Sequence, residues 1–388
     1  MTNDPHDALL RLLAAAGPAE PRRRLLDTCG DPVSALDSGV ATWRAHGLSP
    51  EQIAALCQPD GAALNRAKAW LTASPARHLI GWHDPDYPEL LRRMPGAPVA
   101  LFVAGDPARL WHPAVAVVGS RAPTAGGREH ASEFARAFVA AGLAVTSGLA
   151  AGIDTAAHHG ALEARGLTVA VLGTGPDIAF PRGNAGLLER IAHEGAVVSE
   201  HLPGTGGRRE HFPSRNRIIA GLSLGTLVVE AAYRSGALIT ARLAADAGRE
   251  VMALPGSIRN PMARGCHRLI RDGAALVERP QEVIEALAAP AAALADALRG
   301  RLATPIQGTV TSVVERDNGA VGDTSPAGPT DSPDYKRLWR ELGHDPMDMD
   351  GLVSRTGLTA AELASMLLVM ELEGRVVSQH GRYTRRVS

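Results

Sequence analysis

The residues with the clearest capacity for chemistry are a glycine, a serine and an arginine that follow a short apolar run. Gly119, Ser120 and Arg121 come directly after Val115–Val118. Glycine lets the backbone approach a ligand closely, serine donates a hydroxyl hydrogen bond, and arginine can clamp a phosphate in a bidentate manner. A helix that begins after them would also point its first amide groups at an anion. These residues predict a phosphate-binding loop, and an ordinary tight turn with a solvated arginine fits them equally well when they are taken alone.

Segments of similar composition recur at four later points of the chain. They contain Gly148 and Gly152, then Phe180 and Arg182, then Arg215, Asn216 and Arg217, and finally Ser235 and Gly236. An exposed aromatic ring beside an arginine can stack on a base while the arginine contacts a phosphate, although core packing of Phe180 agrees equally well with the sequence. The third segment belongs to a stretch of four arginines within ten residues, and a helix starting near Ile218 would direct Arg215 and Arg217 toward the strand ends. Together the segments predict a groove.

Residues that could catalyse a reaction are few. The sequence has no GxGxxG after the first of these apolar runs, no GxxxxGK[ST], no Ser-His-Asp ordering and no paired carboxylates. Asp154 and His158 lack a third ligand at the usual spacing for zinc, so Asp154 is expected to cap a helix or orient an arginine, and His159 to pack. Glu230 is the one carboxylate considered for catalysis, but an isolated buried acid is more often a hydrogen-bond acceptor. We therefore predict no catalytic residue, no metal and no cofactor.

These segments must be positioned by strands and helices, and the region from about residue 114 to about residue 280 alternates between the two. The apolar runs lie at Val115–Val118, Leu143–Thr146, Thr168–Leu172, Ala196–Val198, Thr226–Val229 and Val251–Leu254, and helical stretches lie at Glu129–Ala141, Ile153–Ala164, Ala185–His193 and Ala237–Ala247. Apolar runs without polar alternation, separated by helices, are typical of a parallel sheet covered on both faces. Ligands bind such sheets outside the carboxyl ends of the strands. The sequence therefore predicts an α/β fold with a doubly wound, extended Rossmann-like parallel sheet.

The chain divides into four segments of different character. Residues 1–78 show short apolar periodicities broken by Gly and Pro, and they predict a small helical module of the SAM-like or helix-hairpin-like kind. Residues 79–288 hold the predicted sheet, and residues 289–334 have the composition of a flexible linker. Residues 335–388 regain periodicity and predict a helix-turn-helix with a wing. The second helix of that tail has no Lys or Arg, so it suits guanine readout poorly, and a protein-contact role is at least as plausible.

The composition limits the class of protein. The chain of 388 residues carries a net charge of −1 at pH 7, which argues against bulk coating of nucleic acid but leaves room for a local basic groove. Its three cysteines are scattered and predict neither a disulfide framework nor a zinc site. Neither a basic signal-peptide start nor an apolar run of about 18–20 residues is present. We therefore expect a soluble cytoplasmic protein with no membrane contact.

Several motifs in this order resemble the DNA-processing protein A (DprA, or Smf) family over about residues 80–285. The residues that carry the resemblance are Gly119-Ser120-Arg121, the GLAAGID segment 148–154, Phe180-Pro181, the FPSRNRII segment 212–219 and the SGALIT segment 235–240. The resemblance implies a protein without enzymatic activity that binds single-stranded DNA in natural transformation, protects it and loads the RecA recombinase onto it. It also implies a homodimer, with Ile270 and Leu276 as the apolar contacts, although both residues fit a core position equally well.

The same resemblance assigns DNA contact to Arg121 and to Arg182, which stands where the family often has a lysine. It places Phe180, Arg215, Asn216 and Arg217 near the groove. A rival resemblance is to nucleoside-monophosphate phosphoribohydrolases, which carry a PGGxGT-type loop before an acid. The equivalent stretch Ser223–Glu230 lacks the double glycine, so hydrolysis is the weaker prediction. A scaffold that binds only proteins would leave the arginine-rich loops unexplained.

Overall fold

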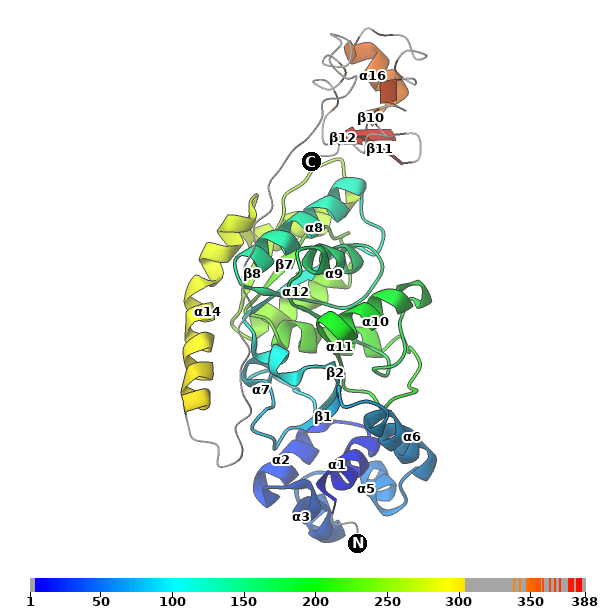
Figure 1. The fold of residues 1–388 in the computed structure, drawn as a ribbon, viewed down its shortest axis with the longest axis vertical. Helices are drawn as coiled ribbons and strands as arrows, with labels where there is room; N and C mark the ends of the chain where they lie inside the picture. The colour runs from blue at the N-terminus through cyan, green and yellow to red at the C-terminus, as the bar shows by residue number, and fades with distance from the viewer. Residues whose placement is uncertain are drawn as a thin grey trace. The chain divides into compact units, whose positions relative to one another are not determined.

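Figure 1 shows the computed structural model of the chain, which describes residues 4–303 and, farther along, residues 338, 342, 347–356, 358, 363, 366–367, 370, 376–379 and 382–385. The chain divides into two compact units, residues 1–295 and residues 296–388. From residue 304 onward, the predicted linker lies outside the described residues, and so does most of the helix predicted over 359–374.

The first unit is built around a nine-stranded sheet with the order β1-β2-β6-β5-β4-β3-β7-β8-β9. Its parallel strands are β3 (Ala114–Val118), β4 (Ala144–Ser147), β5 (Thr168–Leu172), β6 (Ala196–Ser199), β7 (Gly225–Val228), β8 (Glu250–Ala253) and β9 (Ala275–Leu276). Two antiparallel strands that the sequence did not predict as a pair, β1 (Arg77–Gly81) and β2 (Ala100–Gly105), extend one edge. The prediction of a doubly wound α/β fold is confirmed.

The order of the strands reverses at β3. This strand pairs with β4 on one side and with β7 on the other, so the chain winds outward from it in both directions. In doubly wound sheets the crevice at such a reversal, outside the carboxyl ends of the strands, is where ligands bind. The topology therefore singles out the loop that begins at Gly119.

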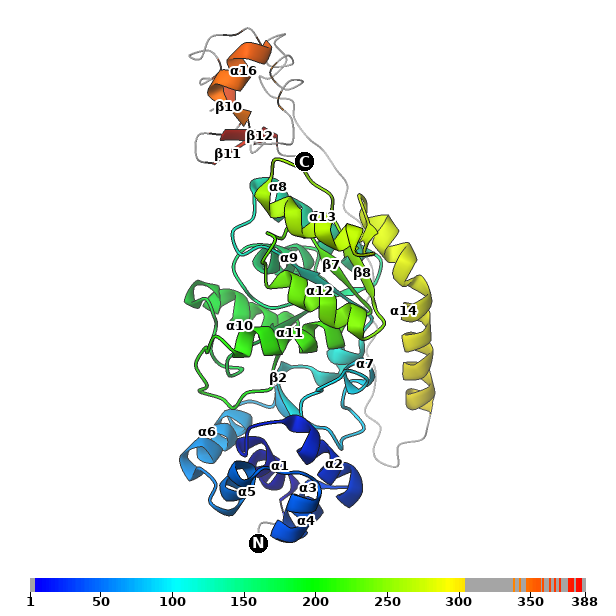
Figure 2. The same ribbon diagram turned by 180° about the vertical axis from the view of Figure 1, so that it is seen from behind.

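Helices cover both faces of the sheet because successive strand residues point to opposite sides. Val115 and Val117 pack with Phe134 of α8 (Ala125–Ala140), whereas Ala116 and Val118 pack on the other face with Ile219. The first face carries α8, α9 (Ile153–Glu163), α10 (Ala185–Glu194) and α14 (Pro280–Ala303), and the second carries α11 (His211–Gly221), α12 (Ala237–Asp246) and α13 (Arg264–Arg271). Figure 1 shows α8 and α9 in front of the sheet, and Figure 2 shows α11, α12 and α13 in front of it.

The amino-terminal segment forms six helices, α1 (Pro5–Ala14), α2 (Ala19–Cys29), α3 (Pro32–Asp37), α4 (Gly39–Ala45), α5 (Pro50–Cys57) and α6 (Gly61–Thr72). Side chains of Asp4, Asp31, Ser49 and Asp60 accept hydrogen bonds from the first backbone amides of four of them. Such caps satisfy donors that have no partner within the helix. The module shares its core with the sheet, since Leu79 and Phe102 pack among its leucines and the Trp70 ring meets Phe102 edge-on at 5.8 Å.

The segment after residue 289 departs from the prediction. A linker was expected to begin there, but α14 continues to Ala303, because alanine has the highest helix propensity and a run of it sustains a helix even past Pro290. None of the helices in the described part of the chain is both long and apolar enough to cross a bilayer.

The second unit contains α16 (Met349–Thr356) and a three-stranded sheet with the order β10-β12-β11. Its strands are β10 (Met347–Asp348), β11 (Val376–Gln379) and β12 (Arg382–Arg385). The antiparallel pair β11 and β12 occupies the position of the predicted wing. Buried leucines and methionines, including Leu352, Leu367 and Met370, form a core of its own.

Candidate functional site

A cleft of about 730 Å³ opens at the reversal of the strand order. It lies outside the carboxyl ends of β3 and β7, against the starts of α11 and α12. Most of the residues predicted for the groove line it, namely Gly119, Ser120, Arg121, Phe180, Arg215, Asn216, Ser235 and Gly236. The fold thus brings together loops that lie far apart in the sequence.

The loop that carries Ser120 and Arg121 is held by backbone contacts on both sides. The Ser120 amide donates to the Glu230 carbonyl at 2.6 Å, and the Ser120 carbonyl accepts from the Ile153 amide at 3.1 Å. Gly119 permits this approach, because a Cβ there would lie 2.6 Å from Ile153 Cγ1 and 2.8 Å from the Glu230 carbonyl oxygen. The Glu230 carboxylate accepts from the amide and hydroxyl of Thr124, the cap of α8, at 2.9 and 2.7 Å. Glu230 is therefore a structural acceptor.

Arg121 is exposed at the mouth of the cleft. Its guanidinium carbon lies 5.7 Å from the centre of the Phe212 ring, and it makes no hydrogen bond or ion pair with any part of the chain that the structure describes. An arginine placed in this way keeps all five of its N–H donors available for an anionic ligand.

Phe180 lies at the surface, so the alternative of core packing, which the sequence left open, does not apply. Its side chain is 47% exposed, and its ring packs against Phe212 with the centroids 4.8 Å apart and the planes tilted by 40°. We call Phe180 and Phe212 the aromatic pair. An aromatic face that remains open to solvent beside a free guanidinium can stack on a nucleic-acid base.

Arg215 lines the cleft with very little of its surface exposed. It is 3% exposed and donates from Nη1 to the Val171 carbonyl. Burial lowers the pKa of Arg215 to about 10, against the opposing effect of the Asp154 charge. Burial in turn raises the pKa of Asp154, and this rise is opposed by Arg215 and by backbone amides. The carboxylate accepts from the amides of Gly148 and Ala150 at 3.1 and 3.4 Å, so it organises the loop after β4.

The two predicted glycines of that loop have separate steric roles. A Cβ on Gly148 would overlap the Arg215 guanidinium, and a Cβ on Gly152 would overlap the Ser120 carbonyl oxygen. Gly152 also has a φ of +87°, a conformation that costs other residues energy. Both glycines therefore shape the cleft from behind its surface.

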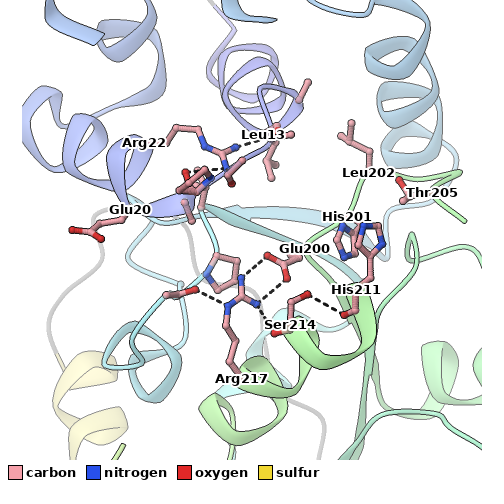
Figure 3. A pocket seen from close by; sticks show the side chains of 18 residues that line it. Leu13, Glu20, Arg22, Glu200, His201, Leu202, Thr205, His211, Ser214 and Arg217 are labelled. Atoms are coloured by element: carbon pink, nitrogen blue, oxygen red, sulfur yellow. Dashed lines mark hydrogen bonds and ion pairs between the residues drawn. The ribbon is translucent and has the colours of Figure 1, made fainter. Parts of the chain in front are cut away.

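Arg217, which was predicted near the groove, does not line this cleft. The helix begins at His211 and not near Ile218, so Arg215 and Arg217 both lie within α11, about 200° apart around its axis. Arg217 points away from the cleft and forms an ion pair with Glu200, with N–O distances of 2.6 and 2.8 Å. Figure 3 shows this pair beside His201 and His211, at a second cavity of about 640 Å³.

Arg182 stands apart from the lining residues. It is exposed in the short 3-10 helix Arg182–Asn184, which follows Phe180 and precedes α10. The cleft also contains residues that were not predicted, among them Arg209, Arg234, Ile239 and Met262. Arg209 belongs to the arginine-rich stretch and Arg234 directly precedes Ser235, so position next to predicted residues was a usable signal for these two.

The histidines of α9 do not form a metal site with Asp154. His158 is buried, and its Nδ1 lies 2.7 Å from the Thr168 hydroxyl, which itself donates to the Val145 carbonyl. Nδ1 is therefore the donor, and burial lowers the pKa of His158 to about 3. His159, which was expected to pack, is exposed. The described residues contain no group of three or more side chains arranged to hold a metal.

The two predicted dimer residues differ in exposure. Leu276 is 50% exposed on β9, the last strand of the sheet order. Ile270 is half-buried in α13 and packs against the core below that helix. Leu276 thus presents an apolar side chain at a sheet edge, where a second chain can bind.

Comparisons with known proteins agree with this architecture. A family model described as DNA recombination-mediator protein A matches residues 78–288, and one described as the DprA winged helix domain matches residues 322–382. Protein Smf of Escherichia coli is 37% identical over 324 residues, which cover 83% of this chain and 81% of that protein. Protein Smf of Synechocystis is 38% identical over 318 residues, with 78% and 79% covered. The X-ray structure of DNA processing protein A from Streptococcus pneumoniae superposes with a TM-score of 0.61 at 35% identity, covering 74% of this chain and 98% of that one.

Proposed function

The chain belongs to the DNA recombination-mediator protein A family, and on this premise we propose that it binds single-stranded DNA along the cleft, protects the strand and loads the RecA recombinase onto it. The observation that carries the proposal is the free guanidinium of Arg121 beside the aromatic pair. Stacking faces next to phosphate-binding groups are the elements of sequence-tolerant binding to a single strand. A double helix keeps its bases stacked inside and would leave the exposed Phe180 ring without a partner.

A binding role is favoured over hydrolysis by the hydrogen bonds of the two acids at the cleft. Asp154, which lines the cleft, is buried and accepts from the amides of Gly148 and Ala150. Hydrolysis of a nucleotide needs a carboxylate that can reach the substrate. Glu230 accepts hydrogen bonds from Thr124 and from the Asn260 amide group at 3.3 Å, so its oxygens are engaged in holding the start of α8. We propose that the protein acts without catalysis, and incubation with nucleoside monophosphates followed by product analysis tests this.

Replacing Arg121 or Arg182 with alanine is expected to weaken binding to single-stranded DNA and to reduce the slope of log affinity against log salt by about 0.7 for each phosphate that is no longer neutralised. Arg136→Ala is the matched control, since Arg136 is an exposed arginine on α8 that pairs with Glu163 outside the cleft. Fluorescence titration over a range of salt measures all three variants. An unchanged affinity and slope for both Arg121→Ala and Arg182→Ala would mean that the strand binds elsewhere.

We also propose that the protein acts in the cytoplasm as a homodimer through Leu276 on β9 and Ile270 on α13. An exposed leucine on an edge strand supports this. Introducing a charge with Ile270→Glu is expected to halve the mass measured by light scattering, and an unchanged mass would exclude this interface.

Recombinase loading is tested by whether the protein accelerates RecA filament formation on a strand already coated by a single-strand-binding protein. Cell fractionation tests the cytoplasmic location.

A further inference from the structure

A second basic surface lies beside the cleft, between the helical module and the sheet. It comprises Ala63 and Arg66 of α6 and the loop from Leu202 to Arg208 after β6, which together enclose a shallow hollow of about 460 Å³. We call it the exit surface. We propose that a single DNA strand leaving the cleft continues over the exit surface, where Arg66 and Arg208 bind its phosphates. This inference rests on the proposed function and extends it to the helical module.

The loop 202–208 connects the two sites directly. At one end, a Cβ on Gly207 would lie 3.2 Å from the Phe212 ring and 3.3 Å from the Phe180 ring, so the loop touches the aromatic pair. At the other end, a Cβ on Gly204 would lie 3.5 Å from Arg66 Nε. A strand whose base stacks on Phe180 therefore has a continuous path along the loop to α6.

The charges of the exit surface are not used within the protein. Arg66 and Arg208 are exposed, and neither side chain makes a hydrogen bond or ion pair with a described residue. Other arginines of the amino-terminal region donate to backbone carbonyls, as Arg11 does to Leu56 and Arg22 to Leu12. Arg66 and Arg208 thus retain their hydrogen-bonding capacity for a ligand outside the protein.

The loop also contributes backbone amides that have no partner among the described residues. It is anchored by the Gly204 amide, which donates to the Asp177 carboxylate at 2.9 Å, and by the Thr205 carbonyl, which accepts from the Gly175 amide at 2.8 Å. Between these anchors and α11, the amides of Gly206, Gly207 and Arg208 have no partner among the described residues. Successive free amides of this kind are suited to anionic oxygens.

The chemistry of the surface favours a phosphate backbone over a protein partner. Protein interfaces have apolar cores enriched in aromatic residues and methionine, and in arginine as well. The residues that line this hollow include two arginines but no aromatic residue or methionine, and Leu202 is their one large apolar side chain. Contacts to phosphate are made by arginines and backbone amides and carry no sequence information. Such contacts suit a protein that must hold any strand.

The test compares strands of two lengths on the full chain. An oligonucleotide of about 6 nucleotides is short enough to fill the cleft alone, and one of about 20 extends beyond it. The double variant Arg66→Ala/Arg208→Ala is expected to bind the short strand as the wild type does. It is expected to bind the long strand about tenfold more weakly, with a salt slope reduced by about 1.4 because two phosphates are no longer neutralised.

The matched control is Arg44→Ala/Arg136→Ala, which removes one exposed arginine from the helical module and one from α8 and is expected to change neither titration. Equal affinity of the double variant and the wild type for the long strand would overturn the exit surface, while Arg121→Ala would still weaken both lengths if the proposed function holds. Failure of the wild type to bind either strand would overturn the proposed function itself.

Discussion

Replacing Arg215 with methionine is expected to lower the free energy of unfolding by about 3 kcal/mol, because it leaves the buried Asp154 carboxylate without the positive charge that opposes the rise of its pKa. The Asp154 carboxylate is buried, and Arg215 is the cation that most strongly opposes the rise of its pKa. The Val171 carbonyl would also lose its donor. Urea denaturation monitored by circular dichroism measures the loss, and methionine is chosen because it keeps most of the side-chain volume.

A double-mutant cycle separates the charge effect from lost packing. Asp154→Asn keeps an oxygen that can accept from the Gly148 amide but carries no charge, so the double variant Asp154→Asn/Arg215→Met is expected to recover part of the stability. The coupling energy should fall within about 0.5–3 kcal/mol, the range for residues in one polar network. Additive losses would show that Arg215 stabilises the fold by packing and by its hydrogen bond to Val171, without coupling to Asp154.

Gly152→Ala is expected to produce the second large effect, and it should affect DNA binding as well as stability. The residue has a φ of +87°, and an added methyl group would overlap the Ser120 carbonyl oxygen. The strained backbone conformation alone costs about 1–3 kcal/mol. The overlap adds to this cost and displaces Arg121, so the affinity for single-stranded DNA should fall at least as far as in Arg121→Ala.

Gly142→Ala is the matched control for this substitution. Gly142 also has a positive φ, +79°, but apart from its chain neighbours no described residue has an atom within 4 Å of the point that its Cβ would occupy. It is expected to lose about 1–2 kcal/mol from the backbone conformation and to keep its DNA affinity. If the two variants lost the same stability and bound DNA equally, contact between Gly152 and the Ser120 loop would have no part in shaping the cleft.

The sequence predicted the central sheet well because the strands from β3 to β7 are buried along their whole length. Thr168–Leu172 consists of apolar residues and one threonine and lies between two neighbouring strands. A buried strand can therefore be predicted there from the local sequence alone. β1 and β2 are harder to predict, since their antiparallel pairing depends on the helical module that covers Leu79 and Phe102. The loops after parallel strands could be grouped from the sequence, since those strands end at the same edge.

Side-chain roles within the site were less predictable. Arg215 and Arg217 are two residues apart and of the same type. Arg215 is buried beside the cleft and donates to the Val171 carbonyl, whereas Arg217 forms an ion pair with Glu200. Their difference follows from the start of α11, which lacks a side-chain cap and so gives no clear signal in the sequence. The proximity of Arg66 to Gly204 is a contact between segments far apart in the chain, and no local pattern encodes it.

The hydrogen bonds that fix the Ser120 loop also affect how the loss of conformational entropy on binding is divided between the protein and the DNA strand. The loop is held to Glu230 and Ile153 before any ligand arrives, so it loses little conformational freedom on binding. A preorganised site reduces the ordering cost on the protein side, and the remaining cost falls on the flexible strand. Affinity for different DNA strands should therefore vary with their own stiffness and residual folding, while the protein presents the same rigid surface to each of them.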